Sequence, residues 1–173
     1  MLGVALNSSM QLRTQRTNQQ FQSALEAEKR KSEIREKEKA LALERLAKAH
    51  RLLSTIGREF SLTNLTIIWR AEMKDSEYDQ RYLAYCEEVD ELRVIAGLFE
   101  TTISEDVEKL YGQMNIFWGN FMNVLRLTSI GEKVDHNTSC FQIAHETASD
   151  IGGLVGAIKS RLTELATRHR NDG

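Results

Sequence analysis

The chain has 173 residues, of which 41% are hydrophobic, with a formal net charge of −2 and no proline. A chain of this length buries one core, so we expect a single domain with one extended element. Proline interrupts helices, and a chain without it that is rich in Ala, Leu, Glu, Lys and Gln is predicted to be all-α. Residues 1–60 carry a net charge of +5 and residues 61–173 a net charge of −7. That division favours docking between the two halves, or a basic partner for the acidic half.

Residues 8–57 are predicted to form one long helix. Its middle segment, residues 26–40, has Ile34 as its single large apolar side chain, and a helix that is polar all round is a solvated strut. We therefore predict a coiled-coil-like arm over residues 1–40 that leads into an antiparallel helical bundle over residues 41–170. The apolar side chains of the arm are candidates for a membrane tether or an oligomer contact: Leu2, Val4, Leu6, Leu12, Phe21 and Leu25.

Apolar residues at a three-four spacing predict the buried faces of about four main helices in the bundle. The second main helix is expected to start with Asp75 or Ser76 as its N-cap, and a short helix is expected before it. The expected core residues are Leu46, Ala49, Leu53, Ile56 and Phe60; then Tyr78, Tyr82, Tyr85, Val89, Leu92, Ala96 and Phe99; then Val107, Leu110, Met114, Phe117, Phe121 and Leu125; and last Phe141, Ala144, Ala148, Ile151, Val155, Ile158, Leu162 and Leu165.

Three glycines, Gly152, Gly153 and Gly156, fall inside the last of these helices. Glycine within a helix costs about 1 kcal/mol relative to alanine, so a compensating interaction is expected. We predict that another helix approaches closely at these glycines, with Trp118 or Phe121 as its contacting residue.

Residues 72–109 carry 12 acidic and 4 basic side chains, which makes this segment the expected landing site of a basic partner. Val89 and Leu92 occupy its buried face, so the neighbouring acids are predicted to point outward. A later helix carries more large side chains than one buried face requires, among them Trp118 and Met122. The predicted partner-binding residues are Glu87, Glu88, Asp90, Glu91, Trp118 and Met122.

One short pattern suggests an enzyme instead. The segment RLAKAH, from Arg45 to His50, resembles the Arg-x4-His motif of HEPN-domain ribonucleases, which are small helical bundles. The resemblance implies that Arg45 and His50 would stabilise charge and transfer protons at an RNA phosphate. The residue after the arginine is polar in that family, whereas this chain has Leu46 there.

Other chemistry finds little support in the residue spacing. His136, Cys140, His145 and Asp150 do not share one helix face, so we predict no metal site and no cofactor. The basic residues of the arm are interleaved with acids and lack aromatic neighbours, which disfavours nucleic-acid binding. Cys86 and Cys140 lie on apolar faces, which favours free thiols in a reducing compartment over a disulfide.

Two segments, KAHRLLSTIGREFSLTNL and DELRVIAGLFETTISEDVEKLYGQMNIFWGN, resemble a loose group of small bacterial proteins of no assigned function. In these proteins an apolar N-terminal anchor precedes a charged helix and a compact bundle. The resemblance implies a membrane anchor, of which residues 2–6 would be the remnant, since no stretch of about 20 apolar residues is present. The positive flank at Arg13 and Arg16 then predicts a cytoplasmic location at the inner face of the cytoplasmic membrane.

Together these features predict a non-catalytic interaction protein: an adaptor, an assembly subunit or an inhibitor of another protein. We expect it to form a homo-oligomer or to be membrane-tethered through its N-terminal helix. The alternative is a ribonuclease or toxin that uses Arg45 and His50.

Overall fold

The structure is a computed structural model that describes the backbone of residues 2–171 and the side chains of residues 15, 16 and 18–171. These residues form helices and no strand, so the all-α prediction is confirmed. The elements are α1 (Leu2–Glu59), α2 (Leu62–Arg70), α3 (Asp75–Leu98), the 3₁₀ turn η1 (Thr101–Ile103), α4 (Ser104–Ser129) and α5 (Ser139–Asn171). The chain divides into an N-terminal unit, Met1–Leu43, and a bundle unit, Glu44–Gly173.

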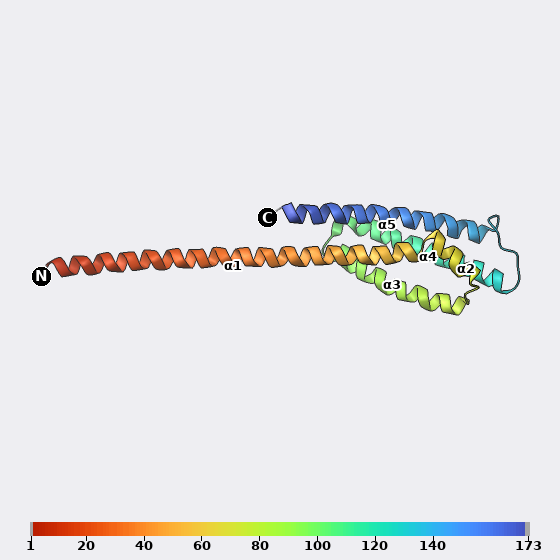
Figure 1. The fold of residues 1–173 in the computed structure, drawn as a ribbon, viewed down its shortest axis with the longest axis horizontal. Coiled ribbons are helices and arrows are strands. Elements are labelled where there is room, and N and C mark those ends of the chain that lie inside the picture. The colour runs from red at the N-terminus through yellow and green to blue at the C-terminus, as the bar shows by residue number, and fades with distance from the viewer. Residues whose placement is uncertain (1, 172–173) are drawn as a thin grey trace. The chain divides into compact units, whose positions relative to one another are not determined.

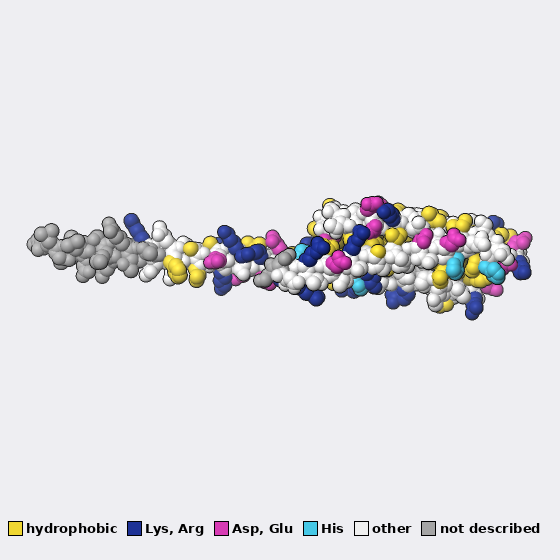
Figure 2. All heavy atoms as spheres, turned by 90° about the horizontal axis from the view of Figure 1, so that it is seen from above, with side chains coloured by type: hydrophobic (Ala, Val, Ile, Leu, Met, Phe, Trp, Pro, Cys, Tyr) yellow, Lys and Arg dark blue, Asp and Glu magenta, His cyan; other side chains and the backbone are white. Residues whose placement is uncertain are grey.

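The N-terminal unit consists of helix α1 alone. All side chains from Asn18 to Glu38 are exposed, including the large apolar residues Phe21, Leu25 and Ile34, each more than half accessible to solvent. Figure 2 shows apolar, basic and acidic side chains interleaved along the described part of this helix. The absence of a large apolar residue from most of residues 26–40 explains why this segment has no core of its own.

The bundle unit packs the end of α1, together with α2, α3, α4 and α5, around one core. In Figure 1 the successive long helices run in opposite directions, as an antiparallel bundle requires. The predicted buried faces of α1 and α4 are correct at every position. In α3 and α5 the predicted positions are also buried, except for Phe99 and for Tyr85, Phe141 and Leu165, which are half-buried against the core. Phe60 packs its ring edge-on against Phe117 at 5.4 Å and against Tyr85 at 5.9 Å, just after α1 ends.

Two details at the ends of α3 differ from the prediction. The N-cap is Lys74, whose side chain makes no capping hydrogen bond, while Asp75 accepts a hydrogen bond from the Ser76 amide at 2.7 Å. Phe99 is 49% exposed and not buried, because α3 ends at Leu98 and Phe99 no longer follows the helical spacing. The Arg45 guanidinium covers the Phe99 ring instead, 4.3 Å from its centroid.

Helix α4 ends in a Schellman motif. Gly131 has a φ of +78°, the left-handed conformation that glycine adopts without a steric penalty. The Glu132 amide donates to the Leu127 carbonyl and the Gly131 amide donates to the Thr128 carbonyl, each at 3.0 Å. This turn starts the connection that returns the chain to α5.

The predicted close approach at the α5 glycines is wrong. A methyl group added at Gly152, Gly153 or Gly156 would meet no atom within 4 Å, and all three residues are exposed. The sequence pattern could not place them because they lie beside the buried positions Ile151 and Val155 without belonging to that face. Among the glycines whose surroundings the structure describes, Gly57 of α1 is the one that packs closely: an added Cβ would lie 3.0 Å from Val155 Cγ1.

Candidate functional site

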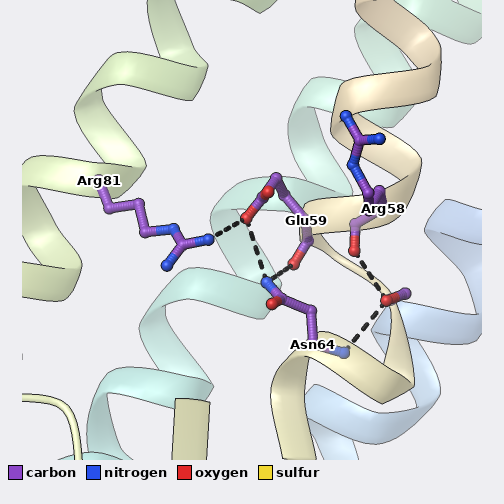
Figure 3. Close-up of polar contacts among 5 residues, drawn as sticks. Arg58, Glu59, Asn64 and Arg81 are labelled. Carbon is purple, nitrogen blue, oxygen red and sulfur yellow. Dashed lines mark hydrogen bonds and ion pairs between the residues drawn. The ribbon is translucent and has the colours of Figure 1, made fainter. Parts of the chain in front are cut away.

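The turn between α1 and α2 is held by a polar network that the sequence did not predict (Figure 3). Ser61 is the N-cap of α2: its hydroxyl accepts from the Asn64 amide at 3.2 Å and donates to the Arg58 carbonyl at 2.7 Å. The Asn64 side-chain amide donates to the Glu59 carbonyl at 2.7 Å. Ser61, a preferred N-cap residue directly before an apolar helical segment, is the sequence signal from which this cap could have been predicted.

Glu59 connects this turn to α3. Its carboxylate, with 16% of the side chain exposed, accepts from Arg81 Nη2 at 2.6 Å and from Asn64 Nδ2 at 3.2 Å. Hydrogen bonding to Tyr85, and then to Glu59, raises the pKa of Arg81 above its usual value. Three helices therefore meet at one partly buried ion pair, which joins the end of α1 to α2 and α3.

Glu88 lies about two turns beyond Arg81 on α3, and the prediction that it points outward is wrong. Its Oε2 atom is buried and has no hydrogen-bond partner among the described residues. Burial, followed by the nearby carboxylate of Glu59, raises the pKa of Glu88, whereas Arg58 opposes that shift. Glu88 is thus a half-buried acid near Glu59, with one oxygen desolvated, and contributes less than an exposed acid to an outer acidic surface.

The other three acids predicted to bind a partner, Glu87, Asp90 and Glu91, have different environments. Glu91 is half-buried and forms an ion pair with Lys48 of α1, so it is partly used in holding the bundle together. Glu87 and Asp90 are exposed as predicted, and Asp90 accepts from Arg93 Nη1 at 3.1 Å. The acidic surface available to a partner therefore centres on Glu87 and Asp90.

Trp118 and Met122 are half-buried on α4, next to the core. The Trp118 ring stacks on Tyr82 at 5.2 Å and its Nε1–H donates to Asp79 at 2.9 Å. Trp118 of α4 is therefore used in the contact with α3. Partner binding by Trp118 and Met122 stays a prediction.

Arg45 and His50 lie on different sides of α1. Five residues separate them, which places them about 140° apart around the helix. The Arg45 guanidinium faces Phe99 at the end of α3, whereas His50 faces α5, where burial and then the charge of Lys159 lower the pKa of His50. Within one chain, therefore, the two side chains do not converge on one phosphate-sized site.

His136 and His145 line one open pocket of about 350 Å³ at the start of α5. Its other lining residues are Thr66, Phe141, Gln142 and Glu146. In the described part of the chain, no group of three or more His, Cys, Asp or Glu side chains has a geometry that could hold a metal ion.

Of the predicted tether residues, Phe21 and Leu25 are exposed in the N-terminal unit. Leu2, Val4, Leu6 and Leu12 lie outside the residues whose side chains the structure describes. Among the described residues, no helix is both long enough and apolar enough to cross a bilayer. The membrane tether stays a prediction.

The fold and these sites define an all-α protein in which a solvated N-terminal helix leads into a bundle fastened by buried polar contacts. Comparison with models of protein families, with curated proteins and with solved structures finds no match to this chain. Its function is therefore argued from its own residues.

Proposed function

We propose that this protein acts by binding and not by catalysis: it self-associates through the N-terminal helix and presents the bundle to a protein partner. The observation that carries the proposal is the exposure of every side chain from Asn18 to Glu38, large apolar residues included. A helix acquires most of its stability in water from packing one face against another element. A partner helix on this segment supplies that packing.

The composition of this helix supports a helical partner that also carries exposed apolar residues and charges of both signs. Phe21, Leu25 and Ile34 are 68%, 58% and 55% exposed, respectively, and burying such side chains contributes about 1.5–3 kcal/mol each. The charged residues between them include both signs, which is typical of helices that pair with other helices through mixed charges. A second copy of the same chain is the simplest partner that offers helices of this kind.

Sedimentation velocity of the full chain over a wide concentration range tests this proposal. We expect the wild-type protein to sediment as more than a monomer. Ile34→Ser with Leu41→Ser, which removes two exposed apolar side chains from one helix face, should weaken the association at least tenfold by removing about 3 kcal/mol of apolar burial. The control, Gln22→Ser with Glu36→Ser, changes two exposed polar side chains of the same helix and should leave association unchanged. A wild-type protein that is monomeric throughout contradicts self-association.

A second measurement tests the ribonuclease alternative. Purified protein incubated with single-stranded RNA should leave the RNA intact. Cleavage that disappears in both Arg45→Ala and His50→Ala, with the helical circular dichroism of each variant unchanged, would instead establish the ribonuclease alternative.

A further inference from the structure

The solvent-facing side of α3 carries a stripe of apolar and acidic residues. We call this the acidic stripe: Leu83, Glu87, Asp90, Val94 and Leu98. All five are exposed, Leu83, Val94 and Leu98 to 63%, 53% and 72%, respectively. The three-four spacing places them on one face, opposite the buried residues of α3. An outer face of a bundle helix is usually polar, so three large exposed aliphatic residues at this spacing indicate a contact surface.

The N-terminal unit carries a stripe of the opposite sign. We call this the basic stripe: Ala27, Arg30, Ile34, Lys37 and Leu41. These residues also follow a three-four spacing, and all of them are exposed, Ile34 to 55% and Leu41 to 53%. Each cation of this stripe lies between two apolar residues, whereas the two acids of α3 follow one another between Leu83 and Val94.

The two stripes match in length. At 1.5 Å per residue each covers about 21–23 Å of helix. Each begins and ends on an apolar residue, Ala27 and Leu41 in one and Leu83 and Leu98 in the other, with its charges between. Laid side by side in either direction, the helices bring aliphatic side chains together at both ends. One of the two cations, Arg30 or Lys37, then lies level with Glu87, and the other lies about one helical turn from Asp90.

We propose that the basic stripe of one copy docks along the acidic stripe of a second copy, as the two helices of a coiled coil do. The inference rests on the proposed self-association and adds the surface that receives the N-terminal helix. Charge complementarity selects this occupant: Glu87 and Asp90 attract a basic helix and would repel another α3 face. Each copy carries both stripes, so two copies can dock reciprocally.

Charge reversal in separate chains tests the docking. The first variant carries Arg30→Glu with Lys37→Glu, and the second carries Glu87→Lys with Asp90→Lys. We expect each variant alone to associate at least about tenfold more weakly than wild type, because like charges then face each other. An equimolar mixture of the two should associate about as tightly as wild type, because every acidic stripe again meets a basic one.

Two matched controls carry the same charge changes on other faces. Lys29→Glu with Arg35→Glu lies about 120° around the helix from the basic stripe, at 100° per residue. Glu146→Lys with Glu164→Lys places two exposed charges on α5. Both controls should associate as wild type does, and circular dichroism should show that all four variants keep their helices.

The outcomes separate this inference from the proposed function. If reversal on the N-terminal helix weakens association but reversal on α3 does not, or if the mixture fails to restore it, the docking is refuted while self-association through the N-terminal helix stands. A wild-type protein that is monomeric refutes both. In support of the docking, association should also weaken as salt rises to about 1 M, where charges are screened beyond about 3 Å.

Discussion

Replacing the three exposed glycines of α5 with alanine should stabilise the protein. Gly152, Gly153 and Gly156 are helical, and a methyl group at any of them meets no atom within 4 Å. Alanine is favoured over glycine in a helix interior by about 0.8–1 kcal/mol, so the triple variant should gain about 2–3 kcal/mol. For a chain of this size the gain corresponds to a rise in melting temperature of about 5–10 °C.

Urea unfolding followed by tryptophan fluorescence measures this gain in the bundle alone, because Trp69 and Trp118 both lie in the bundle unit. Gly57→Ala is the matched control: its new methyl group would lie 3.0 Å from Val155 Cγ1, so steric crowding should offset the same gain in helix propensity. A triple variant that is less stable than wild type would refute the open surface at these glycines. It would mean that another helix or a second copy packs there.

Three further predictions concern titratable groups of the bundle. Arg81→Met should lower the free energy of unfolding by about 1–3 kcal/mol, measured in urea, because it leaves the mostly buried Glu59 carboxylate without its charged donor; an unchanged value would show that the ion pair contributes nothing. Burial raises the pKa of Glu88 above 4.5, so as the pH falls the native state binds this proton before the unfolded state does. The buried charge therefore lowers stability at neutral pH and no longer does so well below pH 4.5. Glu88→Gln should therefore raise stability more at neutral pH than below pH 4.5, and an equal effect at both pH values would contradict this. The pKa of His50, followed by NMR, should lie below 6.5, and in Lys159→Gln it should rise while staying below 6.5, because burial is the larger cause; no change in that variant would rule out the contribution of Lys159.

The sequence was sufficient to predict the helices and their buried faces. Leu53, Met114 and Phe121 belong to patterns in which apolar residues recur every three or four positions, and each is fully buried. Such a pattern depends on the geometry of one helix only, so it survives without knowledge of the neighbours. The two helix ends that were misjudged, at Lys74 and Phe99, are places where the periodicity stops and local hydrogen bonding decides.

The polar network at the turn between α1 and α2, and the burial of Glu88, could not be predicted in the same way. Glu59 and Arg81 are 22 residues apart, and their pairing depends on how three helices meet after a turn. Glu88 has the same type and spacing as its exposed neighbour Glu87, but the 100° rotation of one residue turns it toward α1. Which face of a helix meets which neighbour is a property of the assembled bundle, and single-helix periodicity does not contain it.

Helix α3 has one face that periodicity predicts correctly and a second face whose role depends on a neighbouring helix. Its apolar residues fall into two sets: Val89 and Leu92, with others of their face, are buried, whereas Leu83, Val94 and Leu98 lie on the opposite side and are exposed. A helix that needs only to close a bundle gains nothing from the second set, since those side chains remain in water. Two apolar stripes on opposite faces are what a helix requires when it packs against its own bundle on one side and against another helix on the other. The exposed basic stripe of the N-terminal helix has the charge and spacing to be that other helix.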